Sequence, residues 1–427
     1  MTRITLLSLL ILTLISRVAV AQMQYRVVYN FGTNSVRDAA LPNGGLIMLK
    51  GVLYGTSWVG GQTYETGQCS GGCGTVFALE SFYGNPAEAV IYSFCKTADP
   101  NTCADGAFPV GGLISDASGN LYGTAQGGGS EACVDGGLGG CGVAFRLSRS
   151  GKTWTETVLY SFTGPDGERP TSTLTFDSKG NLYGTTVFGG AYGAGNVFEL
   201  TPGLGDIWTE TTLHDFNPAI GDGAEPFLSG VTFDSAGNLF GTTATSGTGK
   251  CQFDQYAGCG TLFELSPNPD GTWDESILFE LGKNLAFPEA TLVFDNAGRL
   301  YGTTYGGGGE GCGLSCGSVF RLTPQGGAWK AQTFLFSGSN GEAPMAGVSL
   351  KDGNLYGTTT AGGSKGYGVL YKIQNGIETV LHDFSGYPGD GANPQFGGAM
   401  LWVDGNFYGV TSSGGTNEWG TIFQLTP

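Results

Sequence analysis

Ten cysteines are the first residues in this sequence whose type and spacing suggest chemistry. They form five close pairs, with three or seven residues between the partners. Local disulfides are the simplest interpretation, whereas a zinc site needs four converging ligands and the chain has only two histidines to help. The sequence predicts five short disulfide loops: Cys69/Cys73, Cys95/Cys103, Cys133/Cys141, Cys251/Cys259 and Cys312/Cys316. We expect these bridges to stiffen loops and not to replace a core.

A second candidate group is an acid or amide four residues before a recurring proline, mostly as Asp-Gly-x-x-Pro. The seven members are Asp38, Asp105, Asp166, Asp222 and Asp390, with Asn284 and Asn340. Such side chains commonly cap the turn that they begin, and the pattern favours that role. The alternative is a ring of carboxylates at a channel mouth that binds a cation such as calcium. No other cofactor is predicted.

Histidines and unmatched acids could serve catalysis. His214 and His382 stand where other copies of the same motif have Tyr or Phe, which favours a packing role over a catalytic one. Glu131, Glu289 and Glu310 have no counterparts in the other copies. They are therefore candidates for the paired carboxylates of an enzyme that cleaves polysaccharides.

One position varies in content although the repeat fixes its place. It follows a Gly-Thr-x sequence and is occupied in turn by Trp58, Gln126, Val187, Ala244, Tyr305, Thr360 and Ser412, with Phe188 one place further on. Exposed aromatic rings beside polar groups suit sugar rings or peptide side chains. The predicted ligand-binding residues are Trp58, Gln126, Phe188 and Tyr305, and the alternative is that they cover neighbouring loops.

These residues lie within four motifs that each occur seven times. Leu-Tyr-Gly-Thr has its aromatic residue at Tyr54, Tyr122, Tyr183, Phe240, Tyr301, Tyr356 and Tyr408, a mean spacing of 59 residues. Gly-x-aliphatic-aromatic ends at Phe77, Phe145, Phe198, Phe263, Phe320, Tyr371 and Phe423. A run typified by residues 156–162 has relatives that end at Phe31, Phe94, Phe216, Leu281, Phe336 and Phe384. The fourth motif is the stretch that follows each proline. Each predicts one strand, called A (after the proline), B (Leu-Tyr-Gly-Thr), C and D in chain order.

Four short strands repeated at this spacing are typical of propeller blades. The chain begins with a D strand at residues 25–31 and ends with a C strand at residues 421–425. The leading strand therefore fits as the missing fourth strand of the last blade, which would close the ring and remove exposed sheet edges. We predict an all-β, seven-bladed β-propeller of four-stranded blades with minimal helix content.

Two copies, Asn181-Leu182-Tyr183-Gly184-Thr185-Thr186 and Gly195-Asn196-Val197-Phe198-Glu199-Leu200, resemble the GloVer-type tandem repeat (Gloeo/Verruco) of exported bacterial proteins. The resemblance covers nearly all of the chain after residue 21 and implies no catalytic residues. Members often carry a C-terminal sorting anchor, whereas this chain stops at Pro427, and a soluble protein is expected. The order of residues is also similar to NHL-type propeller repeats, which implies that strand A is innermost.

If strand A lines the channel, the B-to-C and D-to-A connections emerge on one face. All five cysteine pairs and the Asp-Gly-x-x-Pro turns fall on that face. The A-to-B turns on the other face are tight hairpins such as residues 177–181. Because scaffolds place function on long, braced loops, we expect the binding site on the loop-rich face.

The N-terminus and the charge indicate the compartment and exclude some partners. Arg3, an apolar run over residues 4–15 and Ala19-Val20-Ala21 are typical of a signal peptide. We predict a signal peptide over 1–21, a single propeller domain over 22–427, and a secreted or periplasmic monomer. The formal charge of −17 argues against nucleic acid and anionic membranes as partners.

Two classes of function remain. The first, which we favour, is a non-enzymatic binding protein that recognises a glycan, peptide or protein through the loop-rich face. The second is a polysaccharide-acting hydrolase or lyase with paired carboxylates near the channel. Two carboxyl groups within about 5–9.5 Å of each other in one pocket would distinguish the enzyme.

Overall fold

The computed structural model describes residues 23–32, 38–61, 69, 71–81, 84–96, 103–130, 133, 139–253, 256–282, 284–309, 312, 316–394 and 398–427. The segment expected to be a signal peptide lies outside these residues. Glu131 and Glu310, two of the three unmatched acids, also lie outside them.

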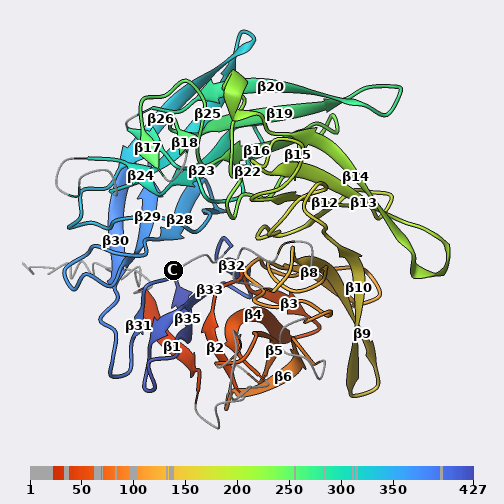
Figure 1. The fold of residues 1–427 in the computed structure, drawn as a ribbon. Helices are drawn as coiled ribbons and strands as arrows, with labels where there is room; N and C mark the ends of the chain where they lie inside the picture. The colour runs from red at the N-terminus through yellow and green to blue at the C-terminus, as the bar shows by residue number, and fades with distance from the viewer. Residues whose placement is uncertain are drawn as a thin grey trace, which may run out of the picture.

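Seven antiparallel sheets surround a common centre (Figure 1), as the four repeated motifs predict. From the centre outward, blade 1 has β2 (Ala39–Pro42) and β3 (Ile47–Leu49) both paired with β4 (Val52–Gly60), then β5 (Thr75–Glu80) and β6 (Ala87–Ser93). Blade 2 has β7 (Ile114–Ser115), β8 (Leu121–Ala125), β9 (Val143–Ser150) and β10 (Thr153–Ser161). Blade 3 has β11 (Thr175–Phe176), β12 (Leu182–Thr186), β13 (Asn196–Pro202) and β14 (Trp208–Asp215). Blade 4 has β15 (Thr232–Phe233), β16 (Leu239–Thr243), β19 (Thr261–Pro267) and β20 (Trp273–Glu280).

The last three blades repeat this order. Blade 5 has β22 (Val293–Phe294), β23 (Leu300–Thr304), β25 (Ser318–Gln325) and β26 (Ala328–Leu335). Blade 6 has β27 (Ser349–Lys351), β28 (Asn354–Thr358), β29 (Val369–Gln374) and β30 (Ile377–Asp383). Blade 7 has β32 (Leu401–Val403), β33 (Asn406–Thr411), β35 (Thr421–Thr426) and, outermost, β1 (Gln24–Asn30).

Short elements decorate the connections between these strands. Three two-stranded sheets are β17 (Gln252–Phe253) with β18 (Tyr256–Ala257), β21 (Leu285–Ala286) with β24 (Gly306–Gly307), and β31 (Gly391–Ala392) with β34 (Ser413–Gly414). The helices in the described residues are two single turns of 3-10 helix, η2 (Leu204–Asp206) and η3 (Pro218–Ile220). None of the described helices could cross a lipid bilayer.

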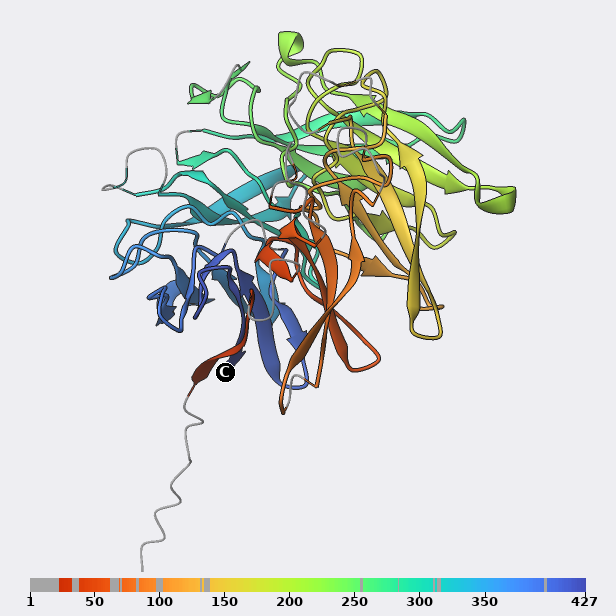
Figure 2. The same cartoon turned by 60° about the horizontal axis from the view of Figure 1, so that its bottom comes forward.

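The N-terminal strand closes the ring as predicted. Strand β1 pairs antiparallel with β35, from Gln24 opposite Thr426 to Asn30 opposite Thr421. Figure 2 shows the red N-terminal strand beside the blue C-terminal blade. The last blade therefore has the fourth strand that its own sequence lacks, and the expectation of a closed seven-bladed propeller is confirmed.

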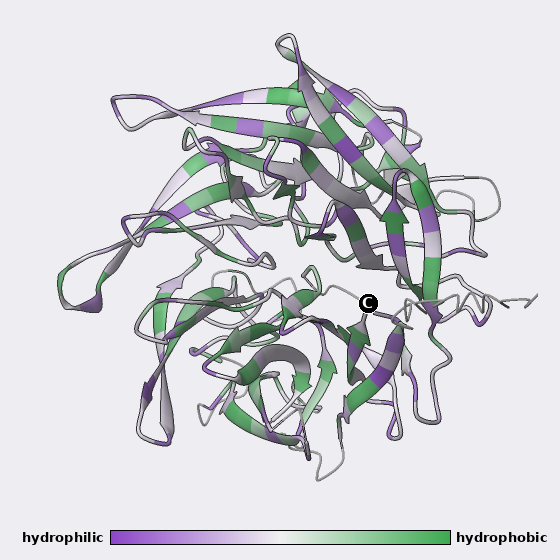
Figure 3. Cartoon of the chain, turned by 180° about the vertical axis from the view of Figure 1, so that it is seen from behind, coloured by the Kyte–Doolittle hydropathy of each residue, from purple (hydrophilic) through white to green (hydrophobic). Residues whose placement is uncertain are grey.

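Packing within each blade explains the glycine of Leu-Tyr-Gly-Thr. A Cβ atom on Gly184 of β12 would lie 2.6 Å from the ring of Phe198 on β13, and Phe198 is fully buried. The same conflict recurs in every blade, from Gly55 against Phe77 to Gly409 against Phe423. The glycine therefore makes room for the strand C aromatic. Figure 3 shows hydrophobic and hydrophilic residues alternating along many strands, as half-buried sheets require.

Contacts between blades explain the threonine of the same motif. The Thr185 hydroxyl donates a hydrogen bond of 2.7 Å to the Ser229 carbonyl oxygen, which belongs to the inner segment of the next blade. Thr56 and Thr124 make the equivalent bonds to the Gly111 and Ser172 carbonyls, at 3.0 and 2.9 Å. This repeated bond links strand B of one blade to strand A of the next.

Candidate binding site at the mouth of the central channel

The repeated aspartates lie at the seams between blades, against the outer strands. Asp105 accepts a 2.7 Å hydrogen bond from the Tyr92 hydroxyl of β6, and Asp166 accepts one from Tyr160 of β10. Asp166 also accepts a 2.7 Å bond from the Thr163 backbone N–H. Each carboxylate thus holds the turn that it begins to the strand before it, and this supports the turn-capping interpretation.

The two histidines take the same seam position as these tyrosines. His214 Nε2 lies 3.1 Å from an oxygen of Asp222, and His382 Nε2 lies 3.0 Å from Asp390. His382 also stacks on Tyr25, with 3.5 Å between ring centroids. His214 joins Asp222 and Glu275 in a group whose ligand atoms all lie within 4.8 Å of one another. A cluster of four cysteines is the other such group in the described part of the chain, and the repeated aspartates do not form one.

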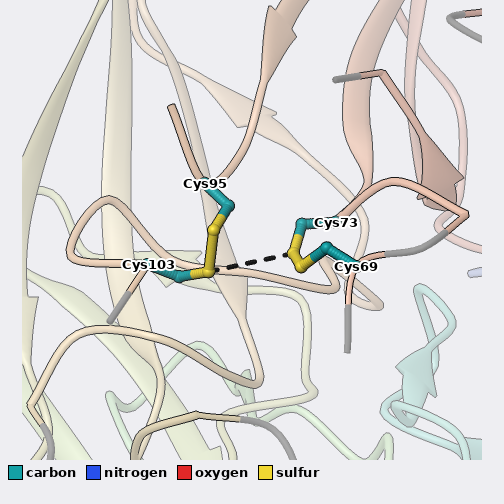
Figure 4. Close-up of side chains that lie close together, drawn as sticks. All are labelled: Cys69, Cys73, Cys95 and Cys103. Atoms are coloured by element: carbon teal, nitrogen blue, oxygen red, sulfur yellow. Dashed lines mark hydrogen bonds between the residues drawn. A yellow bond between two sulfur atoms is a disulfide. The ribbon is translucent and has the colours of Figure 1, made fainter. Parts of the chain in front are cut away.

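Five disulfides join the cysteine pairs that the sequence predicts. Two of them meet in the interior: the sulfurs of Cys73 and Cys103 are 3.8 Å apart (Figure 4). Cys73 belongs to the loop between β4 and β5, and Cys103 to the connection from β6 to blade 2. All four cysteines are buried, so each bridge closes within its own connection and the two bridges pack against each other in the core between blades 1 and 2.

The other three bridges each join a half-buried cysteine to a fully buried one. The half-buried partners are Cys133, Cys251 and Cys312, and the fully buried ones are Cys141, Cys259 and Cys316. Each fully buried cysteine lies two residues before a C strand, namely β9, β19 or β25, where the chain has already entered the interior of the blade. Cys141, Cys259 and Cys316 are therefore packed within the blades, as are the four cysteines of the first two bridges. Without exposed surface, these three side chains take no direct part in binding a ligand.

The residue before each repeated proline has a backbone that sequence reasoning missed. All seven have positive φ although none is glycine: Leu41, Phe108, Arg169, Glu225, Phe287, Ala343 and Asn393, with φ from 51° to 58°. Such φ values are uncommon for non-glycine residues and carry strain. The only signal for this backbone conformation in the sequence was the repeated proline itself, because the residue before it varies in type.

The buried cysteines help to hold this strained residue. The Cys141 carbonyl accepts a hydrogen bond of 2.9 Å from the Arg169 N–H, and the Cys316 carbonyl accepts one of 3.1 Å from the Ala343 N–H. In both cases the donor belongs to the next blade. The bridges of Cys141 and Cys316 therefore support the channel mouth through the backbone.

The strained residue is also bonded to the variable position. The N–H of Phe287 donates to the Cys259 carbonyl of the preceding blade, and its own carbonyl accepts from the Tyr305 N–H at 2.9 Å. Gln126 donates in the same way to Phe108, and Ser412 to Asn393. The residues before the proline and the variable residues are therefore backbone neighbours at the end of each blade that carries the long loops, and we call these fourteen residues the rim.

The predicted ligand-binding residues all lie on or beside this rim and differ in exposure. Trp58 is 39% exposed, and its ring meets Phe108 edge-on at 6.4 Å. Tyr305, Gln126 and Phe188 are half-buried, and the Arg169 guanidinium stands 5.1 Å from the centre of the Phe188 ring. Trp58 is thus open to a ligand, whereas Val187 and Ala244 in the same slot are buried and serve packing.

A cavity lies where the inner segments of the blades converge. Its volume is about 160 Å³, and residues from blades 2 to 7 line it. Six of them lie one or two residues after a repeated proline: Gly111, Thr171, Leu228, Glu289, Ala290 and Met345. This volume lies below the usual range for pockets that hold drug-sized ligands, roughly 300–1,000 Å³, so the cavity has room for a small ligand or head group only. The chain enters each inner segment from the loop-rich face, so these residues lie at that end of the channel.

Among the described residues that line this cavity, Glu289 is the only one with a titratable side chain. Its side chain is 4% exposed, and its Oε2 atom is buried without a hydrogen-bond partner. Burial raises the pKa of Glu289 to about 8, because the interior disfavours the charged form. Glu289, the one unmatched acid among the described residues, thus lies in a cavity.

With the ring and its cavity described, the family can be stated. Residues 132–316 and 314–427 match the Gloeobacter/Verrucomicrobia repeat, so the chain belongs to that family. No curated protein matches it.

Solved structures resemble the fold at low sequence identity. The polysaccharide lyase Uly1 is 12% identical with a TM-score of 0.50, covering 96% of this chain and 94% of its own. A protein provisionally named a 6-phosphogluconolactonase, from Bacteroides uniformis, is 15% identical with a TM-score of 0.47, over 84% of this chain and 89% of that protein. At such identities the likeness shows the fold alone.

Proposed function

We propose that this protein is an exported binding propeller that recognises a glycan or peptide at the rim and the cavity behind it. The observation that carries the proposal is the cavity itself, lined from six blades at the face that bears the disulfide-braced loops. Rim residues differ from blade to blade while the surrounding motifs repeat. A scaffold that repeats while its rim varies is suited to recognition of one particular ligand.

Export of the protein rests on the disulfides. Five bridges without a free cysteine among the described residues suit an oxidising compartment. The signal-peptide pattern of residues 1–21 indicates that the protein is exported through a secretory pathway. We place the protein in the periplasm or outside the cell.

The alternative, an enzyme acting on polysaccharides, has one observation in its favour. A general acid needs a raised pKa, and Glu289 has one. Cleavage by paired carboxylates also needs a second carboxyl group in the pocket, and the described lining residues supply none. The geometry therefore supports binding better than hydrolysis.

Replacing Trp58 with alanine tests the proposed site. The exported protein is first screened on a glycan and peptide array, and the ligand found is titrated against W58A. Loss of an exposed ring that stacks on a ligand should weaken binding several-fold, since stacking contributes about 1 kcal/mol beyond area burial. The melting temperature should stay close to that of the wild type because Trp58 is exposed.

Leu204→Ala is the matched control. Leu204 is 95% exposed and lies between β13 and β14, at the end of the blade away from the rim. Its loss should leave affinity unchanged. Equal affinities of W58A and the wild type, or an array without any ligand, would reject the rim as the binding surface.

A further inference from the structure

The cavity holds a buried acceptor without a donor. Oε2 of Glu289 is buried and has no hydrogen-bond partner. The described cavity lining contains no lysine or arginine that could pair with the carboxyl group. A buried polar atom without a hydrogen-bond partner destabilises the protein, so a ligand that brought a donor to this atom would gain binding free energy from the new hydrogen bond.

The remaining lining residues fit an organic group that carries such a donor. Leu228, Leu292, Met345 and Val348 supply apolar surface, and Thr291 adds a hydroxyl. The Thr291 oxygen accepts the Gly230 N–H at 3.0 Å, which fixes its position while its second lone pair stays available. A ligand with a carbon skeleton and a compact polar head matches this mixture.

The charge of the surrounding protein indicates whether the polar head of the ligand is an anion or a cation. The chain carries a formal charge of −17, and the titratable group in the described lining is an acid. The nearby titratable groups are acidic as well. Burial raises the pKa of Tyr305, and the negative charges of Glu289 and Glu342 raise it further. An anionic head would be repelled, whereas a cation would be attracted and would find its counter-ion at Glu289.

We propose that the cavity binds the ammonium group of a small organic amine, with Glu289 as its counter-ion. This inference rests on the proposed binding function and names the ligand class for it. The ammonium donates to Oε2 of Glu289, and the carbon skeleton lies against the apolar wall. The same head occurs on amino sugars and on alkyl amines, and the experiment separates these two sources.

Release of protons when the amine binds distinguishes a counter-ion role of Glu289 from a purely structural role. In the empty cavity the pKa of Glu289 is about 8, so the carboxyl group is mostly protonated at pH 7. An ammonium binds the ionised form, and binding at pH 7 should therefore release close to one proton. For an amine that stays protonated, such as 1,5-diaminopentane, apparent affinity should rise roughly tenfold from pH 6 to pH 7 and level off above pH 8. Glucosamine has a less basic amino group, and its affinity should fall once it loses its own proton. Tyr305 lies in electrostatic range with its pKa raised above the ordinary value, and stays neutral throughout.

Calorimetric titration of the full exported protein tests the proposal. The probes are glucosamine and 1,5-diaminopentane, each beside a neutral analogue, glucose and 1,5-pentanediol. Titrations at pH 6, 7 and 8 in buffers of different ionisation enthalpy measure the protons released. We expect at least one amine to bind tenfold or more tightly than its neutral analogue, with the release of protons described above. The amine that binds identifies the source.

Two variants complete the test. Glu289→Gln removes the charge in nearly the same volume and should weaken amine binding at least tenfold without lowering the melting temperature. Glu80→Gln, at the exposed end of β5, should bind like the wild type. Equal binding of amine and neutral analogue, unchanged affinity in E289Q, or binding without proton release would overturn the proposal. If E289Q unfolds, proton release by the wild-type protein still decides the question.

The two proposals can fail separately. Binding of glucose or of an array ligand by a protein that ignores both amines would overturn the amine assignment and keep the binding function. Binding of no probe and no array ligand would overturn both.

Discussion

At the scale of single residues, the repeat retains glycine at positions where a side chain would not fit. Glycine at the third position of Leu-Tyr-Gly-Thr makes room for the strand C aromatic in all seven blades. The glycine that begins strand C has a different reason: Gly195 has φ of +89°, and a Cβ there would lie 2.2 Å from the Thr186 carbonyl and 2.9 Å from the Pro226 ring of the next blade. Neither position tolerates a side chain, and both therefore recur.

Gly184→Ala measures the first requirement. The added methyl group would meet the Phe198 ring at 2.6 Å without any backbone strain from a positive φ. Overpacking of this kind costs about 1–3 kcal/mol, and urea unfolding should show a loss of that size.

A double variant and a control make the cause specific. If the clash is responsible, the losses from G184A and Phe198→Leu should be less than additive when combined. Gly282→Ala places its methyl group where no atom lies within 4 Å and should change stability little. Strict additivity would refute the proposed contact.

At the scale of elements, the outer strands meet through pairs of acids. Glu156 of β10 lies beside Asp105 in the seam between blades 1 and 2, and Glu156 Oε1 and Asp105 Oδ1 are both buried without a partner. Burial, and next the charge of Asp105, raise the pKa of Glu156 to about 7. Glu88, Glu210 and Glu275 stand at the same position of other outer strands, and their pKa values are also raised to about 7.

Glu156→Gln should make the protein more stable at high pH. The pKa of Glu156 in the folded protein lies above its ordinary value of 4.5, so its protonated form stabilises the fold. That contribution is complete below about pH 4.5 and is lost as pH rises through about 7. Glutamine imitates the protonated group and can donate to Asp105 at any pH.

Urea unfolding at pH 5, 6, 7 and 8 checks this expectation. E156Q should match the wild type at pH 5 and exceed it by on the order of 1 kcal/mol at pH 8, a figure discounted for partial exposure of the group. Glu80→Gln, on the exposed end of β5, should follow the wild type at every pH. A wild-type advantage that grows with pH would contradict the assignment.

At the scale of the whole molecule, one strand joins three blades. Tyr25 of β1 donates a 2.7 Å hydrogen bond to Asp390, after blade 6, and Tyr29 donates one of 3.2 Å to Glu88 in blade 1. Phe31 is fully buried and meets Phe77 of blade 1 edge-on at 5.0 Å. The pairing of β1 with β35 completes blade 7, so closure depends on the first described residues of the chain.

Deleting residues 22–32 should open the ring. Loss of three buried or half-buried aromatic side chains and of the β35 pairing should lower the melting temperature by on the order of 10 °C. The exposed edge of β35 should promote association, visible by size-exclusion chromatography. A synthetic peptide of residues 23–32 added in trans should restore both properties. An unchanged melting temperature in the deletion would show that β1 is dispensable.

Much of this architecture could be predicted because it depends on short-range patterns. Seven copies of Leu-Tyr-Gly-Thr, a D strand at the start and a C strand at the end sufficed for the blade count and the closure. Local cysteine spacing sufficed for the five pairings, but not for the burial of Cys141 and Cys316, which depends on the sheets packed around them. For the binding site, the sequence predicted the face of the propeller but not which side chains are exposed on it. Trp58 stood out by its type in a variable slot, but its exposure depends on Phe108 and on loops of other blades.

Periodicity and chain direction were enough to predict the number of blades, their strand order and the face that bears the long loops. The sequence marked Glu289 only as an acid without counterparts in the other copies, and the tertiary structure alone shows its surroundings. Glu289 lies in a cavity with its pKa raised, whereas Glu80 lies at an exposed strand end. That difference arises from burial by inner segments of several blades, which are far apart in sequence and converge only when the ring closes.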